Sequence, residues 1–260
     1  MAALRYHGQL PSTALVRVDD AISVTQSMAV PNEDHAMPPA PVWFTAQDRS
    51  SLTRGPLGRI VEWAAQRPSN LIARSMSFDA EGTVFDEAAG ALVFEARVHT
   101  GLVVSDLLAE GSALSFAVIY APLAPNPRTI VTIQGSGEEN YAFASVEEGQ
   151  LRIGIKGGDQ VLSLADPGGM TLLLGVVDGN QIRMAVNDSP DVRGAFTLKP
   201  GLIDIFIGCR GAGRSLRNKI GDFRLFDVMV WPGVDILSAA NQKSTDSARR
   251  LWQQRCKNGV

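Results

Sequence analysis

Few residues of this chain are of the types that carry out catalysis, and their spacing forms no recognised catalytic set. The three histidines, His7, His35 and His99, are scattered along the sequence. No His-x-x-x-His or Cys-x-x-Cys pair offers zinc ligands, and no Gly-x-Ser-x-Gly motif marks a serine nucleophile. The glycine-rich run 208–215 lacks the Gly-Lys-Ser/Thr ending of a phosphate loop. We interpret it as a hairpin loop whose arginines face solvent or a ligand.

Carboxylates are the next candidates, because a glycosidase needs two acidic side chains that face each other across a cleft. The acidic residues considered for this role are Glu138, Glu139, Glu147, Glu148, Asp222 and Asp227. Neighbouring residues of an extended strand point to opposite faces, as do residues five apart such as Asp222 and Asp227 unless a bulge realigns them. We therefore predict that the chain is not an enzyme. A polysaccharide-active hydrolase or lyase stays open as the alternative.

Acidic and amide side chains also gather in turns at the ends of two adjacent predicted strands. They are Asp178, Asn180, Asp188 and Asp191. Their oxygens are ligands that Ca²⁺ accepts, so this set is a candidate calcium site, and calcium is the only cofactor that the sequence suggests. The alternative interpretation is that Asp and Asn occur here because they tolerate turn geometry.

Aromatic and hydrogen-bonding residues near predicted loops form a candidate ligand surface. They are Tyr120, Gln134, Asn140, Tyr141, Arg210 and Arg214. Tyr120, Tyr141 and the nearby Phe143 could stack on a sugar face, while the amides supply hydrogen bonds. Core or interface packing of these rings is the alternative.

A series of short strands must position these residues. Alternating apolar residues and regularly spaced turns predict strands at 114–120, 129–134, 150–156, 160–164, 170–177, 181–186, 203–209 and 222–231, preceded by strands within 70–80 and 91–98. This pattern is typical of an all-β sandwich or barrel. The run 170–174 is apolar throughout, which indicates a strand covered on both sides. The apolar phase of the last strand shifts near Leu225, which predicts a bulge there.

Both ends of the chain differ from this middle part. Residues 1–69 read as an extended, proline-rich N-terminal arm, with short strands around 16–24 and one short helix from Pro56. Trp43 and Phe44 follow the proline-rich run and would be exposed unless another subunit covers them. Residues 236–260 predict a C-terminal helix, capped by Ser244 or Thr245. Its apolar face is Ala248, Leu251, Trp252 and Cys256. Trp43, Phe44 and Trp252 are therefore candidate assembly contacts.

Composition limits the function classes. A net charge of −3 over 260 residues gives no electrostatic case for nucleic acid or an anionic membrane as partner. The first residues lack the pattern of a secretory signal, and no apolar run reaches the roughly eighteen residues needed to cross a bilayer. We expect synthesis in the cytoplasm without a signal peptide. The two cysteines, Cys209 and Cys256, are interpreted as free thiols.

The order of strands resembles the concanavalin A-like lectin/glucanase superfamily, in particular its laminin-G-like jelly rolls. The runs that carry the resemblance are 115–120, 150–155, 160–164, 171–187 and, most clearly, 220–231. The resemblance implies a two-sheet antiparallel jelly-roll sandwich over residues 70–235. The glutamate–aspartate–glutamate arrangement of the superfamily's glucanases has no counterpart in this sequence, which argues against hydrolysis.

Together these observations predict a non-catalytic, lectin-like protein displayed on a larger assembly. A phage or phage-derived particle is the expected assembly, with the chain as a spike, fibre or tail component on the virion surface. The N-terminal arm would contact other subunits, and the sandwich would bind cell-surface polysaccharide during host attachment. A purely structural decoration or joining protein without a ligand is a further alternative.

Overall fold

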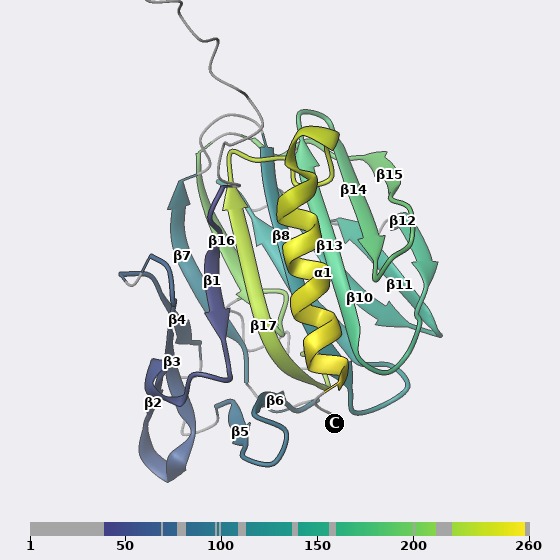
Figure 1. The fold of residues 1–260 in the computed structure, drawn as a ribbon. Coiled ribbons are helices and arrows are strands. Elements are labelled where there is room, and N and C mark those ends of the chain that lie inside the picture. The colour runs from purple at the N-terminus through teal and green to yellow at the C-terminus, as the bar shows by residue number, and fades with distance from the viewer. Residues whose placement is uncertain are drawn as a thin grey trace, which may run out of the picture. The chain divides into compact units, whose positions relative to one another are not determined.

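Two antiparallel β-sheets pack face to face in this protein, with one helix on the outer side of one of them (Figure 1). The computed structural model describes residues 39–68, 70–76, 82–96, 98, 100–108, 113–136, 140–155, 160–199, 201–211 and 220–257. The strands expected around 16–24 lie outside the described residues. The described residues belong to one compact unit, which begins at Pro38.

The eight-stranded sheet has the order β15-β14-β13-β8-β17-β6-β5, and β1 also pairs with β17. Its strands are β1 (Val42–Thr45), β5 (Val84–Asp86), β6 (Ala91–Phe94), β8 (Ala113–Pro122), β13 (Thr171–Asp178), β14 (Gln181–Val186), β15 (Val192–Ala195) and β17 (Phe223–Pro232). Strand β17 has a register shift between Leu225 and Asp227, so the predicted bulge is confirmed.

The nine-stranded sheet has the order β12-β11-β10-β9-β16-β7-β4-β3-β2. Its strands are β2 (Leu52–Arg54), β3 (Ile60–Ala64), β4 (Ile72–Ser75), β7 (Leu102–Leu108), β9 (Arg128–Gln134), β10 (Tyr141–Glu147), β11 (Gln150–Ile155), β12 (Gln160–Ala165) and β16 (Leu202–Ile207). The predicted fold class, a mostly-β sandwich of two antiparallel sheets with a C-terminal helix, is confirmed.

The main core lies between the two sheets and is rich in aromatic rings. Phe94 of β6 stacks on Phe223 of β17 with ring centroids 5.0 Å apart, and Tyr120 of β8 meets the same ring edge-on. Phe44 of β1 packs on Trp63 of β3 at 5.4 Å, which joins the two sheets along one side. Burial of such rings is the main source of stability in a sandwich.

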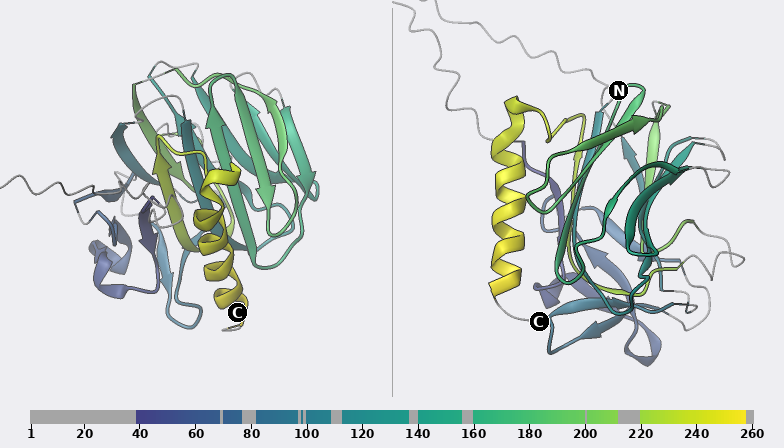
Figure 2. Two further views of the ribbon diagram at one scale, coloured as in Figure 1. Left: turned by 45° about the horizontal axis from the view of Figure 1, so that its top comes forward. Right: turned by 90° about the vertical axis from the view of Figure 1, so that its right-hand side faces the viewer.

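Helix α1 (Gln242–Lys257) covers the outer face of the eight-stranded sheet (Figure 2). Its Ala248, Leu251 and Trp252 pack on a second apolar cluster that includes residues of β8, β13 and β17. Because the core lies on the other side, β13 is covered on both faces, as its continuous apolar sequence predicted.

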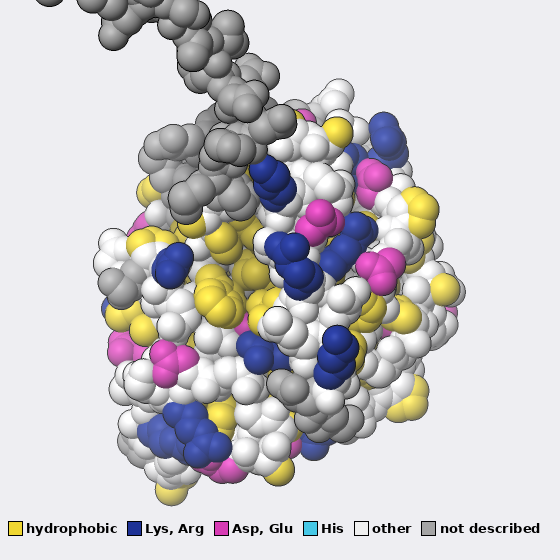
Figure 3. Space-filling view, in the orientation of Figure 1, with side chains coloured by type: hydrophobic (Ala, Val, Ile, Leu, Met, Phe, Trp, Pro, Cys, Tyr) yellow, Lys and Arg dark blue, Asp and Glu magenta, His cyan; other side chains and the backbone are white. Residues whose placement is uncertain are grey.

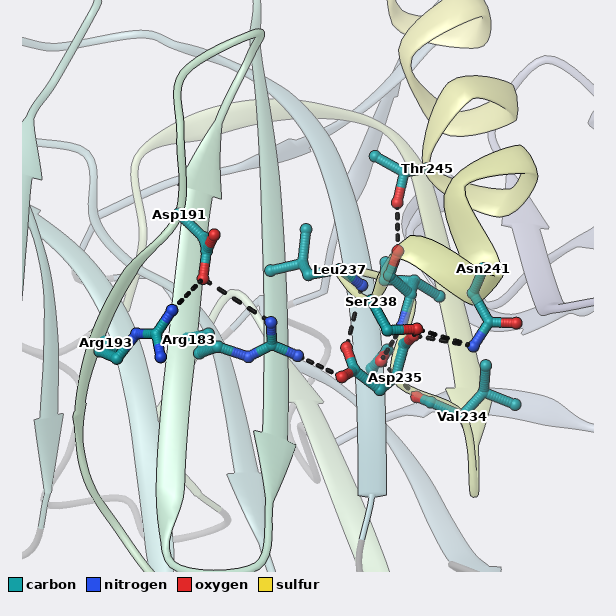
Figure 4. A network of polar contacts seen from close by, with 11 residues as sticks. Arg183, Asp191, Arg193, Val234, Asp235, Leu237, Ser238, Asn241 and Thr245 are labelled. Atoms are coloured by element: carbon teal, nitrogen blue, oxygen red, sulfur yellow. Dashed lines mark hydrogen bonds and ion pairs between the residues drawn. The ribbon is translucent and has the colours of Figure 1, made fainter.

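The segment that leads into α1 is attached by a polar network (Figure 4). Ser115 of β8 donates to the Val234 carbonyl and accepts from the Ile236 amide at 3.1 Å. Arg183 of β14 forms ion pairs with Asp235 and, at 3.7 Å, with Asp191. These contacts fix the start of the helix against β8 and β14.

A buried ion pair fixes the other end of the helix. Asp227 of β17 is fully buried, and its carboxylate accepts from Arg255 Nε at 2.8 Å and Nη2 at 3.0 Å. The indole of Trp43 in β1 donates to the same carboxylate at 3.1 Å, and Arg255 also donates to Thr45. One carboxylate therefore joins β1, β17 and α1.

The structure corrects the expected helix from Pro56, the expected cap of the C-terminal helix and the expected place of Cys256 on its apolar face. The predicted helix from Pro56 is instead a short 3-10 turn, η3 (Pro56–Gly58), followed by strand β3, so the sheets include residues assigned to the arm. Two further 3-10 turns are η2 (Arg49–Ser51) and η5 (Ala239–Asn241). Helix α1 starts at Gln242, so Ser244 and Thr245 are buried inside its first turns and do not cap it. Cys256 is exposed and Cys209 is buried, and both are free thiols.

Among the described residues, no helix combines the length and the apolar character required to cross a bilayer.

Candidate functional site

The outer face of the nine-stranded sheet carries the candidate site. Strands β9 and β10 alternate between core and outer face, so that Val131 and Ile133, with Ala142 and Ala144, belong to the core. The residues between and beside them point outward. On these two strands they are Thr132, Gln134, Tyr141, Phe143, Ser145 and Glu147.

The strand register arranges the outward residues in rows across the sheet. The first row is polar and joins Asp204 of β16, Gln134 of β9 and Tyr141 of β10. The second row contains Phe206, Thr132, Phe143 and Gly154 of β11. The third row contains Thr129, Ser145 and Arg152. Side chains within one row are direct neighbours. Thr129, Thr132, Phe143, Ser145 and Phe206 are buried, whereas Gln134, Tyr141, Arg152 and Asp204 keep exposed surface.

Phe143 is a buried ring, 5% exposed, that lies beneath the Arg210 side chain on this side of the sheet. Its ring lies across β11 at Gly154, where a Cβ atom would be 2.4 Å from Phe143 Cζ, so only glycine fits beneath it. The Tyr141 ring is 6.2 Å from it, between centroids. The guanidinium carbon of Arg210 lies 3.5 Å from the Phe143 centroid, a close cation–π contact.

Arg210 is held in place by the backbone of the loop after β16. The Gly208 amide donates to the Ile130 carbonyl at 2.8 Å, and the Thr132 hydroxyl donates to the Cys209 carbonyl at 2.9 Å. Arg210 Nε then donates to Thr129 Oγ1 at 3.3 Å, and its Nη2 is 3.5 Å from Glu147 Oε1. Desolvation by burial lowers the pKa of the Arg210 guanidinium, an effect that Glu147 and Tyr141 partly offset.

Of the predicted ligand residues, the structure brings together Gln134, Tyr141 and Arg210. Tyr120 instead lies in the core between the sheets with no exposed surface, so it is not available to a ligand, and burial raises the pKa of its hydroxyl. Asn140 is buried and structural, because its side-chain oxygen accepts from the Lys199 amide. Arg214 lies outside the described residues.

Two neighbours of this surface were not predicted as ligand residues. Glu147 was considered only as a catalytic candidate in a turn, whereas it ends strand β10 and pairs with Arg210. Arg152 lies in the third row, and its Nη2 is 3.3 Å from Glu148 Oε2. The alternation in 150–155 placed Arg152 on the polar face of a strand, but nothing in the sequence showed which strands lie beside it.

The four calcium candidates do not form one cluster. Asp178 and Asn180 lie at the turn before β14, whereas Asp188 and Asp191 follow its other end, and a six-residue strand spans roughly 17–20 Å. Asp188 pairs with Arg249 at 3.5 Å, and Asp191 pairs with Arg183. No group of three or more His, Cys, Asp or Glu residues in the described part of the chain is arranged to hold a metal ion.

The candidate catalytic carboxylates that the structure describes do not form a facing pair either. Glu147, Glu148 and Asp227 are each ion-paired with an arginine, and Asp227 has no exposed surface. Asp222 lies in the loop before β17, while Glu138 and Glu139 lie outside the described residues.

The candidate assembly residues make contacts within the chain. Phe44 is fully buried in the core, so another subunit cannot reach it. Trp43 and Trp252 are half-buried and donate to Asp227 and to the Met170 carbonyl, respectively. The space-filling view shows an apolar area beside α1, over β1 and β17 (Figure 3).

No family model and no curated protein matches this sequence. Among solved structures, a point mutant of HCR/D is 8% identical with a TM-score of 0.50, covering 80% of this chain and 51% of its own. The Ruminococcus gnavus IT-sialidase CBM40 bound to alpha2,3 sialyllactose is 10% identical with a TM-score of 0.40, covering 54% of this chain and 82% of its own. Domains LG4-5 of the mouse laminin alpha1 chain are 14% identical with a TM-score of 0.37, covering 54% of this chain and 42% of their own.

These similarities concern the fold. The chain spans about half of HCR/D and 24% of the Streptococcus pneumoniae NanB sialidase, another similar structure. The likeness to HCR/D extends over most of the sandwich, and it shows a shared β-sandwich architecture at very low sequence identity.

Proposed function

We propose that this chain is a non-catalytic, lectin-like module that binds a glycan on the outer face of its nine-stranded sheet. The observation that carries the proposal is the difference between the two outer faces. Helix α1 occupies the outer face of the eight-stranded sheet. The outer face of the nine-stranded sheet has no described helix on it and carries the partly exposed Tyr141 and Arg210 beside a polar row, with the buried Phe143 ring supporting both.

This combination of side chains suits a sugar. The Tyr141 ring remains partly exposed and offers an apolar surface to the C–H face of a pyranose. Gln134 and Asp204, its neighbours in the first row, are partly exposed and offer an amide and a carboxylate to hydroxyl groups. Arg210 is fixed in advance by the Phe143 ring and Thr129, so binding does not require ordering of a long side chain.

A glycan array probed with the labelled chain tests this function, followed by titration calorimetry on the sugars that bind. Tyr141→Ala and Arg210→Gln should each weaken binding at least about tenfold, since each removes a stacking or charged contact. Arg250→Gln, at an exposed position of α1 on the other side of the sandwich, is the matched control and should bind like the native chain. Absence of binding to every arrayed glycan at millimolar sugar would overturn the proposal.

We propose further that residues 1–38 attach this module to a larger assembly, such as the surface of a virion or virion-like particle. The described chain supports a firm attachment point. Trp231 donates to the Pro39 carbonyl at 3.0 Å, and Trp43 of β1 exchanges backbone hydrogen bonds with Gln66 and Arg67 while β1 pairs with β17. A chain lacking residues 1–38 should fold and bind glycan but no longer co-sediment with particles from its native source. Recovery of the native protein only as a free monomer would contradict this role.

A further inference from the structure

Arg210 is the most buried charged group on the outer face of the nine-stranded sheet among those with a described ion pair. Its side chain is 15% exposed, and the Phe143 ring covers one side of the guanidinium. Contacts with described residues use Nε, which donates to Thr129, and Nη2, which faces Glu147. In the described part of the chain, Nη1 donates to no acceptor.

Glu147, the carboxylate that faces Arg210, forms only a long ion pair with it. The Nη2–Oε1 distance to Glu147 is 3.5 Å, whereas charge-assisted hydrogen bonds are about 2.7–2.9 Å long. The Glu147 side chain is 44% exposed, so water stabilises it away from the arginine at little cost. The neighbouring pair has the same asymmetry, because Arg152 is more buried than its exposed partner Glu148.

Arg152 adds a second positive charge to this face. It lies two strands from Thr129, the residue that accepts from Arg210, in the same row of the sheet. Its Nε is buried and has no hydrogen-bond acceptor among the described residues. Arg210 thus lies on the Phe143 ring and Arg152 lies in the adjacent row of the same face, and the acidic partner of each is more exposed than the arginine.

We propose that the glycan recognised on this face is acidic, and that the ring carboxylate of a sugar pairs with the guanidinium of Arg210. This inference rests on the proposed function and specifies its ligand class. A carboxylate matches the planar fork of arginine in two parallel hydrogen bonds, which a sugar hydroxyl or a lysine cannot reproduce. The sugar ring that carries the carboxylate then extends toward Tyr141 and the polar first row.

Matched acid and ester ligands test the inference directly. Oligomers of galacturonate, glucuronate and mannuronate and a sialylated trisaccharide are each compared with their methyl esters, which keep the rings and hydroxyls but lose the charge. Titration calorimetry at low and physiological salt should show at least one acid binding about ten- to a hundredfold more tightly than its ester. This preference should shrink as salt rises.

Three variants locate the effect at Arg210. Arg210→Gln should remove the acid-over-ester preference, and Arg210→Lys should restore only part of it because lysine lacks the planar fork. Glu147→Gln should strengthen binding of the acid severalfold and leave the ester unchanged, since it removes a competing carboxylate. Thermal unfolding of each variant confirms that it is folded, and Arg250→Gln serves as the control.

The outcomes separate the inference from the proposed function. If neutral glycans or esters bind as tightly as the acids, and Tyr141→Ala abolishes that binding, the proposed function stands and the inference of an acidic glycan is overturned. An acid preference that survives Arg210→Gln would also overturn it. Failure of every glycan, acidic or neutral, would overturn both.

Discussion

The ion pair between Asp227 and Arg255 offers the sharpest test of how the sandwich is held together. Asp227 has no exposed surface and the Arg255 side chain is 13% exposed, so Asp227→Ala leaves a mostly buried guanidinium and the Trp43 indole without their acceptor. Removing one partner of a buried pair costs about 3–5 kcal/mol. Because Arg255 lies in the last turn of α1, its side chain can rotate toward water. We therefore expect Asp227→Ala to lower the free energy of unfolding by about 3 kcal/mol, at the lower end of that range.

The reverse substitution should cost more. Arg255→Ala leaves the carboxylate of Asp227 under the helix, where only the Trp43 indole still donates to it among the described contacts. We expect about 4–5 kcal/mol for this change. Each kcal/mol lowers the melting temperature of a domain of this size by roughly 2–4 °C. The two single variants should therefore melt about 6–12 °C and about 8–20 °C below the native chain.

Urea unfolding of the native chain, both single variants and the double variant measures the coupling between the two residues. The double variant should be destabilised by less than the sum of the single variants, with a coupling of at least about 1.5 kcal/mol. Asp246→Ala, which loses only an exposed hydrogen bond from Gln242, is the control and should change stability by less than about 0.5 kcal/mol. Single variants that cost under about 1 kcal/mol, or that add without coupling, would refute the structural role of the pair.

Three further predictions follow from other parts of the chain. Burial raises the pKa of the Cys209 thiol to about 12. An Ellman titration at pH 8 should therefore detect one thiol, Cys256, in the folded protein and two thiols after unfolding. Detection of two thiols in the folded protein would contradict the burial of Cys209. The backbone hydrogen bond from Ala89 holds the pKa of Asp86 below its ordinary value of 3.8. The stability that the ionised Asp86 contributes is therefore present above pH 3.8 and is lost as the pH falls through the lowered pKa. In urea unfolding, Asp86→Asn should lose less stability between pH 5 and pH 2 than the native chain. Leu57 is 82% exposed with a φ of 61°, so Leu57→Gly should be neutral or stabilise by up to about 1 kcal/mol, and a clear loss in thermal unfolding would show that the leucine packs on something.

The sequence predicted the parts of the sandwich where large apolar residues alternate. Strands β13, β14 and β17 were found, and so was the bulge after Leu225. Strand β10 was missed because two of its core-facing residues, Ala142 and Ala144, are too small to produce a clear alternation with Val146.

The helix expected from Pro56 shows the opposite error. Leu57, Ile60, Val61 and Ala64 have helical spacing, but Leu57 is exposed and only Ile60 and Trp63 of the following strand are fully buried. The β-branched and aromatic residues in this run favour a strand, and pairing with β2 and β4 decides between the two structures.

Part of the candidate site was predicted from the sequence. Gln134, Tyr141 and Arg210 were chosen as hydrogen-bonding or aromatic residues near loops, and they share one face. Arg210 is 67 residues from Phe143, the ring on which it stacks, so their contact depends on the order of strands in the sheet. Tyr120 had the same apparent qualities, but its place in β8 directs it into the core.

The most direct test of the central claim is an amide chemical-shift titration of the full chain with an oligomer of galacturonate or with the best ligand from the array. If the outer face of the nine-stranded sheet is the binding surface, the largest shifts should fall on β9, β10, β11 and the loop of Arg210. The chemical shifts of the amides of α1, on the opposite side of the sandwich, should not change. Shifts concentrated on α1 or on the turns around Asp178 and Asp188, or no shifts at millimolar ligand, would contradict the account.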